Sequence, residues 1–468
     1  MVPDNNIPET RNHNEDCLFL NIFQPAHPHS HPTSPRAVMV WIHGGGFETG
    51  SIFSVAYDAS YIAAIGDVIV VTIQYRLGAF GFLSASTEEE TGNNGLYDQI
   101  LALKWVKDNI ADFGGSSKKV TIFGESAGGM SVGALVLSPL ASGLFNRAIL
   151  QSGAPNSYLG SESIEASLDK TNALAGELNC TNSDKKMVLK CLRELKPEAI
   201  VDANEHARLD GETFQPIYGE KLLPIKPSEA LKTGKFNRNL DLMFGTVSEE
   251  GALFVESLFP TYLDPDDNKQ ILTPAKTKTV IKLMFQMFRQ TFGAEVADFY
   301  TRHLTDNSSL SEARLAIAEA FGDYHLTCPT VFFGQYYGKF GKNDVVYAYR
   351  VVQPPAIPVF LKCRGWMGVC HGDDVLYLFA FPIRLKGIVF TEEDYQLSED
   401  IIHSWTTFAK TGKPTTSGMR NGAKWLEAID HDNDKSSVSY MNLDAKNYRM
   451  VNDFYVEQCD QFWKSKIF

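Results

Sequence analysis

Short runs of β-branched and other apolar residues recur along the chain and predict buried strands. These runs span residues 37–43, 68–76, 118–124, 147–153, 240–247 and 344–352. Because the apolar positions are largely continuous rather than alternating, the runs suit parallel strands that are covered on both faces.

Helical patterns lie between the predicted strands. Residues 95–115 end at the Gly114-Gly115 pair, a common helix stop, and place five apolar side chains on one face: Leu96, Ile100, Leu103, Val106 and Ile110. Residues 256–340 are also predicted to be helical and to cover one side of the sheet. Strands that alternate with helices predict the α/β class, with a mostly parallel central sheet and helices on both faces. Nothing resembles a linker, so residues 1–468 are expected to form a single domain.

Composition and charge narrow the classes of partner. The chain has 468 residues, 44% of them hydrophobic, and a net charge of −13 at pH 7. A strongly acidic protein repels phosphate backbones, so nucleic acid is not expected as a partner. No window approaches the run of about 20 apolar residues that a membrane helix needs, so no membrane span is expected. Residues 1–10 are polar and show no signal-peptide core, which by itself favours the cytosol.

The cysteines and glycosylation sequons favour an oxidising compartment instead. The seven cysteines are Cys17, Cys180, Cys191, Cys328, Cys363, Cys370 and Cys459. None forms a CxxC pair, so no zinc or redox motif is predicted. Cys180 and Cys191 flank a short polar segment typical of a local disulfide loop, and Asn179 and Asn307 begin N-x-S/T sequons. We therefore expect a protein of the secretory pathway.

A Pro-rich patch at residues 24–35 carries three histidines at alternate positions, His27, His29 and His31. They could hold a metal ion weakly, but a surface loop between strands is the favoured interpretation. The sequence therefore predicts neither a metal site nor a cofactor.

The segment from Gly124 to Gly128 matches the G-x-S-x-G pattern between a predicted strand and a predicted helix. In such a turn the small neighbours permit crowding, the serine Oγ is lifted clear of the sheet, and the helix N-terminus favours developing negative charge. Ser126 is therefore a candidate nucleophile. Glu125 is expected to add negative potential beside it, or else to be a buried structural hydrogen-bonding group.

Three consecutive glycines, Gly44 to Gly46, directly follow the predicted strand at 37–43. Their N–H groups are not blocked by side chains, which is what an oxyanion hole needs, and Ala127 N–H would be a further donor. A phosphate-binding loop is the competing interpretation. The run lacks both the Lys-Ser/Thr ending of a P-loop and the G-x-G-x-x-G context of a dinucleotide site.

A serine hydrolase also needs a histidine base and an acid, which in this fold follow the serine in the order acid, then histidine. His371 is the favoured base, because it lies on a loop flanked by glycines. His403 lies in a helical pattern and is interpreted as a packing residue. For the acid, the loop after the strand at 240–247 offers Glu249 or Glu250, and local sequence does not separate them.

Several sequence blocks resemble the type-B carboxylesterase/cholinesterase family of α/β-hydrolases. EDCLFLNIF at 15–23 and FGESAGGMSVG at 123–133 resemble the two family signatures. Further blocks match in the same order, at residues 74–83, 92–115, 366–374 and 405–414. The likeness covers nearly the whole chain, which makes it far more specific than any single motif.

The resemblance implies an α/β-hydrolase fold and a serine carboxylic-ester hydrolase that acts on a small-molecule ester through an acyl-enzyme. Ser126 resembles the nucleophile, His371 the general base and Glu250 the acid. The residues that resemble the oxyanion-hole donors are Gly45, Gly46 and Ala127.

The start of the chain departs from the family pattern. Family members carry several dozen residues before the EDCL block, whereas only residues 1–14 precede it here. The resemblance therefore implies an N-terminally truncated domain that lacks edge strands of the sheet, and a Cys17 whose partner lies in the missing segment. It also implies the disulfides Cys180–Cys191 and Cys328–Cys459, and it leaves the states of Cys363 and Cys370 open.

The residues expected around the acyl group also differ from those of an acetylcholinesterase. Asp210, Gly211 and Glu212 stand where bulky aromatic residues are the rule. Leu253 stands where cholinesterases often use an aromatic residue, although Phe254 follows it. An acyl pocket without large rings accepts larger acyl groups, so we expect a general carboxylesterase rather than a choline specialist.

Two alternatives stay open. One is a cholinesterase-like enzyme. The other is a non-catalytic, neuroligin-like adhesion or binding protein on the same fold, because fold alone does not fix function. The intact serine, glutamate and histidine set argues against the second alternative.

Overall fold

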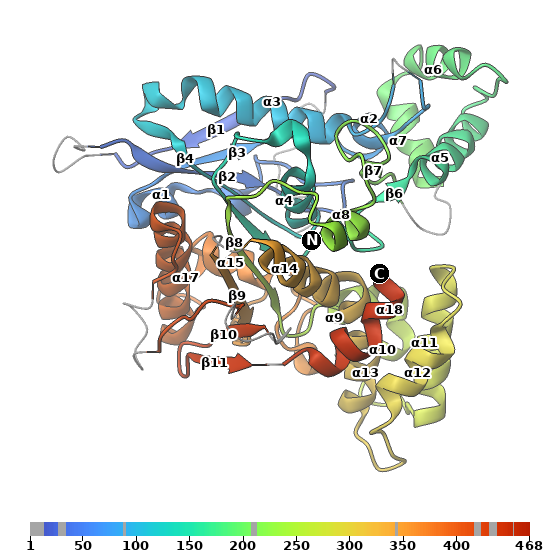
Figure 1. The fold of residues 1–468 in the computed structure, drawn as a ribbon. Coiled ribbons are helices and arrows are strands. Elements are labelled where there is room, and N and C mark those ends of the chain that lie inside the picture. The colour runs from blue at the N-terminus through green and yellow to red at the C-terminus, as the bar shows by residue number, and fades with distance from the viewer. Residues whose placement is uncertain are drawn as a thin grey trace.

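A twisted, mostly parallel sheet forms the centre of the molecule (Figure 1). The computed structural model describes residues 14–26, 34–87, 90–206, 213–341, 345–415, 423–429, 438–452 and 454–468. Within these residues the nine strands follow the order β1-β3-β2-β4-β5-β8-β9-β10-β11. The strands are β1 Leu20–Phe23, β2 Arg36–Ile42, β3 Ile69–Ile73, β4 Gly115–Glu125, β5 Arg147–Gln151, β8 Asp241–Val247, β9 Val346–Val351, β10 Ser439–Leu443 and β11 Arg449–Asn452. A separate short pair joins β6 Glu162–Ser163 to β7 Ile217–Tyr218.

The direction of the strands fixes where the site can form. All neighbours from β3 through β10 are parallel, whereas β1 pairs with β3, and β11 with β10, in the antiparallel sense. The carboxyl ends of the parallel strands therefore meet at one edge of the sheet, where ligands bind in open α/β folds.

The predicted α/β class is confirmed, and each of the six predicted strands corresponds to one observed strand: β2, β3, β4, β5, β8 and β9. The sequence interpretation missed the strands nearest the two ends of the order, β1, β10 and β11. Strands β1 and β11 have four residues each and are only partly buried, so their apolar pattern is weak. Their pairing partners, rather than their own composition, make them strands.

The alternation of side chains along β2 separates two hydrophobic layers. Val38, Val40 and Ile42 belong to the layer that contains α3 and α4, whereas Met39 and Trp41 belong to the layer that contains α1 and α17. All five side chains are fully buried. Both faces of the central strands are thus covered, as the continuous apolar runs predicted.

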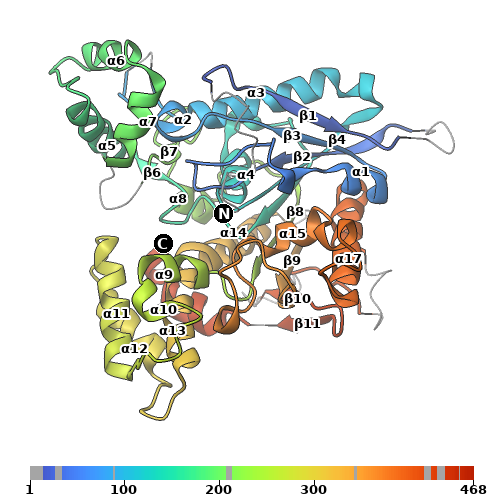
Figure 2. The same cartoon turned by 180° about the vertical axis from the view of Figure 1, so that it is seen from behind.

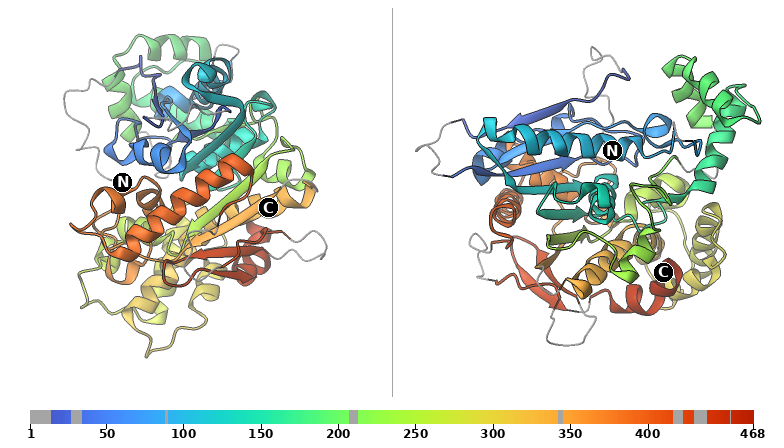
Figure 3. Two further views of the ribbon diagram at one scale, coloured as in Figure 1. Left: turned by 90° about the vertical axis from the view of Figure 1, so that its left-hand side faces the viewer. Right: turned by 45° about the horizontal axis from the view of Figure 1, so that its top comes forward.

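Helices surround this sheet on both faces (Figures 1 and 2). They are α1 Ser60–Gly66, α2 Gly78–Phe82, α3 Asn94–Asn109, α4 Ala127–Leu137, α5 Ile164–Glu177, α6 Lys185–Arg193, α7 Pro197–His206, α8 Pro227–Thr233, α9 Ala252–Leu258, α10 Pro260–Leu263, α11 Pro274–Met287, α12 Gly293–Thr301, α13 Leu310–Gly322, α14 Cys328–Phe340, α15 Asp373–Leu378, α16 Phe381–Arg384, α17 Glu392–Thr411 and α18 Lys464–Ile467. Helices α5 to α7 form a group at the upper right of Figure 1, and α10 to α13 form another below it; Figure 3 gives two further views.

The predicted helix at 95–115 is present as α3, followed by a 3₁₀ turn at Ile110–Phe113. Gly114 ends it with a φ of 78°, a conformation that glycine adopts readily. The predicted helical region at 256–340 contains helices α9 to α14, of which α14 packs against β8. Between α13 and α14 the chain forms one π-helical turn, Asp323–Thr327.

Within the described ranges no helix is both long enough and apolar enough to cross a membrane. The histidines His27, His29 and His31 of the Pro-rich patch lie outside the described residues.

Candidate active site

The Ser126 turn joins the end of strand β4 to the start of helix α4. Ser126 has a φ of 59° and a ψ of −123°, a region that non-glycine residues rarely occupy. Such a conformation stores about 1–3 kcal/mol of strain and persists only where its surroundings enforce it. Here the enforcement is close approach, because a Cβ at Gly124 or at Gly128 would overlap the carbonyl oxygen of Ile42 at the end of β2. The glycines on both sides of Ser126 are therefore required by backbone packing.

The glycine run lies next to this turn at the end of β2. A Cβ at Gly44 would lie 3.1 Å from the Cβ of Ser126. Gly45 has a φ of 112° and its own turn leaves no room for a Cβ, whereas Gly46, with a φ of 64°, has no non-neighbouring atom of the described residues within 4 Å of a Cβ position. The N–H of Ala127, the first residue of α4, has no acceptor within its helix. These N–H groups fit the candidate oxyanion hole.

Tyr75 and His43 contact the start of the glycine run and stabilise it. The sequence analysis identified neither residue. The Tyr75 hydroxyl donates a hydrogen bond of 2.8 Å to the His43 carbonyl oxygen, and the two rings stack at 4.5 Å. His43 Nδ1 lies 2.8 Å from the carbonyl oxygen of Gly44. Burial lowers the pKa of His43 to about 4, so the ring is neutral. His43 is thus a structural support rather than a second base.

His371 and Glu250 meet on two loops that are distant in sequence. His371 Nδ1 lies 2.6 Å from Oε2 of Glu250, and both side chains are buried. The other carboxylate oxygen, Oε1, accepts a hydrogen bond of 2.9 Å from the N–H of Val247 at the end of β8. One carboxylate therefore connects the sheet edge to the imidazole ring. Glu249, the other candidate acid, instead accepts hydrogen bonds from Ser248 Oγ and, at 2.7 Å, from Val369 N–H.

Glu125 lies beside the other nitrogen of the same ring. His371 Nε2 is 3.1 Å from Oε1 of Glu125, although the geometry is not that of a hydrogen bond. Nε2 has no hydrogen-bond partner in the described part of the chain, so it is not bonded to Ser126 Oγ in this state. Glu125 is also close to Ser126, since its Oε2 lies 3.0 Å from a Cβ position on Gly44. Glu125 therefore lies next to both the His371 ring and the Ser126 turn.

A further acid, Asp374, completes the charged surroundings and was not singled out from the sequence. Its Oδ2 accepts a hydrogen bond of 2.8 Å from Gln151 Nε2 at the end of β5. Gln151 in turn accepts one from Trp405 Nε1 at 3.1 Å. Burial raises the pKa of the Asp374 carboxyl to about 6. Only the three-dimensional fold, which brings Gln151 at the end of β5 beside Asp374 in helix α15, reveals this contact.

The carboxylates raise the proton affinity of the histidine. Burial alone lowers the pKa of His371, but the negative charge of Glu125, together with the hydrogen bond and charge of Glu250, outweighs it and raises the pKa to about 9. Burial likewise raises the pKa of the Glu125 carboxyl to about 8. The site therefore retains a proton between these groups more strongly than free imidazole would.

An aromatic ring packs against the histidine. Phe254, on helix α9, lies 5.1 Å from His371 between ring centroids and stacks on Phe321 at 5.2 Å. Leu253 next to it is partly buried. The expected acyl-pocket residues Asp210, Gly211 and Glu212 lie outside the described residues.

The described cysteines form three disulfides: Cys180–Cys191, Cys328–Cys459 and Cys363–Cys370. Cys17 has no disulfide partner among the described residues. The side chains of Asn179 and Asn307 are exposed, as glycan acceptors must be.

His403 lies in helix α17 as predicted, but its side chain is exposed, so its interpretation as a packing residue was wrong. Its position on α17 faces solvent rather than the buried layer.

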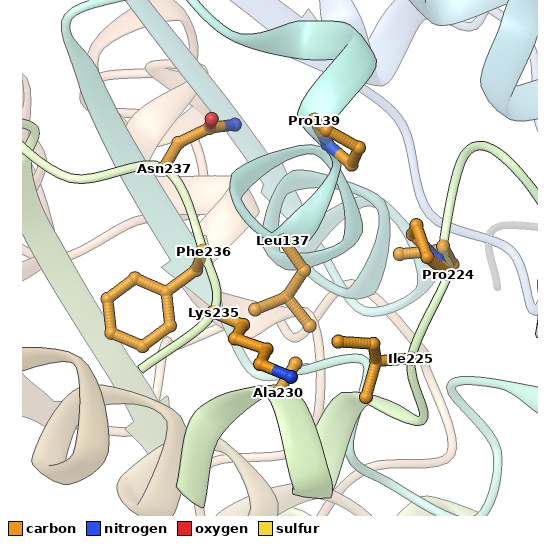
Figure 4. Close-up of a pocket in the computed structure, with 9 residues that line it drawn as sticks. Leu137, Pro139, Pro224, Ile225, Ala230, Lys235, Phe236 and Asn237 are labelled. Atoms are coloured by element: carbon orange, nitrogen blue, oxygen red, sulfur yellow. The ribbon is translucent and has the colours of Figure 1, made fainter. Parts of the chain in front are cut away.

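A separate hollow of about 240 Å³ lies at the far end of helix α4 (Figure 4). Leu137, the last residue of α4, lines it together with Leu223, Ala230 and Phe236. Lys235 is the one charged residue among the described residues that line it. Since α4 begins beside Ser126, the hollow and the candidate active site lie at opposite ends of this helix.

The parallel sheet, the strained serine turn and the acid–histidine pair at the carboxyl ends of the strands define an α/β-hydrolase fold. The chain belongs to the carboxylesterase family, whose profile matches residues 2–463. Members of this family hydrolyse carboxylic esters.

Three characterised relatives are similar over most of the chain. Acetylcholinesterase-1 of Trittame loki is 36% identical over 425 residues, which cover 88% of this chain and 73% of that protein. Acetylcholinesterase of Bungarus fasciatus is 33% identical over 429 residues, or 88% of this chain and 67% of that protein. Cholinesterase of Mus musculus is 32% identical over 460 residues, or 97% of this chain and 72% of that protein.

Proposed function

We propose that this protein is a carboxylic-ester hydrolase that works through an acyl-enzyme on Ser126. His371 Nε2 takes the proton of Ser126 Oγ as Oγ attacks the ester carbonyl carbon. The alcohol leaves with that proton, and a water molecule, activated by the same nitrogen, then releases the acid and regenerates the serine. Glu250 orients the imidazole and stabilises its protonated form.

The N–H groups of Gly45, Gly46 and Ala127 are the proposed oxyanion hole. They would hold the negative charge that develops on the carbonyl oxygen during both steps. Removal of one such donor costs about 2.7–4 kcal/mol in characterised hydrolases. The open space beside Gly46 supports this assignment, because an incoming carbonyl group needs room there.

The observation that carries the proposal is the 2.6 Å contact between His371 Nδ1 and Glu250 Oε2, beside a serine held at a φ of 59°. A serine in strained backbone with a buried acid–histidine pair next to it is the arrangement that acyl transfer needs. The proton transfer requires Nε2 to turn from Glu125 toward Ser126. Catalytic hydrogen bonds often form fully only when substrate is bound.

For the substrate, we propose a broad range of acyl groups rather than choline esters alone. The absence of large aromatic residues at Asp210, Gly211 and Glu212 supports a wide acyl pocket. The relatives named as cholinesterases support the alternative of a cholinesterase-like enzyme. The three disulfides and the exposed sequons support a secretory location.

A fluorophosphonate probe tests the acyl-enzyme directly. We expect the probe to label the folded protein on Ser126, as located by peptide mass spectrometry, and to leave Ser126→Ala unlabelled. Absence of labelling in folded wild-type protein would contradict the proposal and favour a non-catalytic binding protein.

A substrate panel tests the range of acyl groups. We expect kcat/KM for p-nitrophenyl esters to be maintained or to rise from acetyl to butyryl and longer chains. A kcat/KM for acetylthiocholine at least tenfold above that of every uncharged ester would instead identify a cholinesterase-like enzyme.

A further inference from the structure

The Cys363–Cys370 disulfide ends at the residue directly before His371. The two Cα atoms are 6.3 Å apart, within the usual range of about 4.4–6.8 Å for a disulfide. Cys363 is 3% exposed and Cys370 fully buried, so the bond lies inside the molecule rather than on its surface. It closes a loop only seven positions long next to the proposed base.

Cys370 also contacts the loop that carries the proposed acid. Glu249 and Cys370 form an isolated parallel bridge, in which Glu249 N–H donates to the Val369 carbonyl oxygen at 3.1 Å. Val369 N–H donates in return to the Glu249 carboxylate at 2.7 Å. Because Glu250 and His371 each follow a member of this bridged pair, the bridge places the acid beside the base.

A second set of contacts anchors the same residue from the other side. Cys370 N–H donates to Asp373 Oδ2 at 2.9 Å, and Asp373 N–H donates to the Cys370 carbonyl oxygen at 3.0 Å. The other Asp373 oxygen accepts from Val359 N–H at 3.0 Å. The disulfide then connects Cys370 to Cys363, which lies in the segment that follows Val359. Backbone hydrogen bonds, the Asp373 carboxylate and the disulfide thus connect the residue before His371 both to the Glu249 loop and to the segment 359–363.

Without the disulfide, the loop between Cys363 and Cys370 would have many backbone conformations available to it. Gly365 and Gly368 within it have φ values of 63° and 62°, and Gly372 after His371 has a φ of 88°. Glycines at such angles have many alternative conformations to lose when the loop is ordered. A covalent bond across the loop removes those alternatives.

We propose that Cys363 and Cys370 are positioning residues for acyl transfer, and that their disulfide holds His371 in register with Glu250. This inference rests on the function proposed above. Reduction by a dithiol would break the sulfur–sulfur bond, add two electrons and two protons to give two thiols, and leave the dithiol oxidised. The ring would then lose its alignment although Ser126 and the glycine run remain unchanged.

The expected effect is a fall in kcat with little change in KM. Displacement of a reacting group by about 1 Å costs on the order of 100-fold in rate. We therefore expect Cys363→Ala/Cys370→Ala to lower kcat for a p-nitrophenyl ester about 10- to 100-fold, and the rate of fluorophosphonate labelling equally. The low-field proton resonance of the His371 Nδ1–H shared with Glu250 should broaden or move upfield, which a merely structural role would not cause.

The matched control removes the other short-range disulfide. Cys180 and Cys191 are 11 positions apart; Cys180 precedes helix α6 and Cys191 lies near the end of that helix, in the group of helices at the upper right of Figure 1. Cys180→Ala/Cys191→Ala should lower the melting temperature but leave kcat within about twofold, because no residue of that bond touches His371. An equal fall in kcat in both double variants would overturn the proposal.

Reversible reduction of wild-type protein tests the proposal even if the variant does not fold. With dithiothreitol, activity should fall in step with alkylation of Cys363 and Cys370, followed by mass spectrometry, and should return after reoxidation. Cys180→Ala/Cys191→Ala should keep this sensitivity, and Cys363→Ala/Cys370→Ala should lose it. A chelator must be present, because the two thiols and the Asp373 carboxylate lie within 4.8 Å of one another and would bind a thiophilic cation.

The outcomes separate this proposal from the function itself. Wild-type protein that neither hydrolyses esters nor reacts with the fluorophosphonate overturns the proposed function. Active wild-type protein whose kcat is unchanged on reduction of Cys363–Cys370 overturns only the positioning role.

Discussion

The turn that carries Ser126 and the loop that carries His371 are held in place by different kinds of contact. Ser126 is positioned by backbone alone, because its φ of 59° follows from the close approach of β4 and α4 to the end of β2. His371 is positioned by side chains, through its 2.6 Å contact with Glu250 and through the disulfide before it. The nucleophile therefore depends on space between backbones, and the base depends on charged and covalent partners.

This difference predicts which substitutions remove activity without unfolding the protein. Changes around His371 should affect the reaction far more than the fold, because a side-chain partner can be replaced by an isostere. Changes around the Ser126 turn should affect fold and reaction together, because no side chain fits there.

Glu250→Gln should have the largest effect on activity. Glutamine keeps the size of the side chain but removes its charge and favours the wrong imidazole tautomer, a change that costs about 10⁴-fold in kcat in a related triad. We expect a similar fall in kcat, measured with a p-nitrophenyl ester, and a folded protein by circular dichroism.

The matched control for Glu250→Gln is Glu249→Gln. Glu249 bonds to Ser248 and Val369 rather than to His371, and glutamine can still accept the Val369 N–H. Its kcat should stay within about tenfold of wild type. A greater loss in Glu249→Gln than in Glu250→Gln would show that the acid had been assigned wrongly.

The same contrast explains how much could be predicted from the sequence. The serine turn and the glycine run were found because their constraints lie within a few consecutive residues that follow a strand. The choice between Glu249 and Glu250 stayed open on local grounds, since it depends on a bridge between Glu249 and Cys370 that are far apart in the chain. The resemblance to a family, not the local pattern, selected Glu250.

Other contacts were missed for the same physical reason. Tyr75, which follows strand β3, binds the residue before the glycine run, and Asp374 of helix α15 accepts a hydrogen bond from Gln151 at the end of β5, so neither carries a local signal. The bond between Cys363 and Cys370 was left open, because spacing alone does not fix connectivity.

Gly128→Ala should be the most destabilising small substitution near the serine. The new Cβ would overlap the Ile42 carbonyl oxygen, and backbone atoms at the end of a central strand cannot move aside cheaply. Overpacking of this kind costs about 1–3 kcal/mol, and we expect the upper end of that range or more. Urea unfolding measures the loss, and kcat should fall as well.

Gly176→Ala is the control for the glycine argument. Gly176 lies in helix α5, and among the described residues no atom outside its own stretch of helix lies within 4 Å of its Cβ position. Alanine there should stabilise the protein by about 0.5–1 kcal/mol, because it loses less backbone entropy on folding. Equal destabilisation by both substitutions would show that space at Gly128 is not what fixes the turn.

Tyr75→Phe tests the support behind the glycine run. It removes the 2.8 Å hydrogen bond to the His43 carbonyl oxygen and leaves that buried oxygen without its donor. The expected cost is about 1–3 kcal/mol in the free energy of unfolding. If the glycine run forms the oxyanion hole, kcat should fall modestly while KM stays nearly constant. A change in KM alone would contradict that assignment.

Glu125→Gln should have the smallest effect, a shift of the pH profile. A general base works only when it is unprotonated, so activity falls as the pH drops through the pKa of His371. Burial lowers that pKa, while the charges of Glu125, Glu250 and Asp374 raise it to about 9.

Replacement of Glu125 removes one of those negative charges. The pKa of His371 should therefore fall, and the acid limb of kcat/KM against pH should move to lower pH. Glu249→Gln serves again as the control and should leave the limb nearly where it is, because Glu249 bonds to Ser248 and Val369 rather than to His371. An acid limb that stays fixed or moves to higher pH in Glu125→Gln would mean that the proton taken from Ser126 is not held next to Glu125. Glu250 alone would then control the protonation of the base. The difference between the Ser126 turn and the His371 loop would then depend on one carboxylate rather than on two.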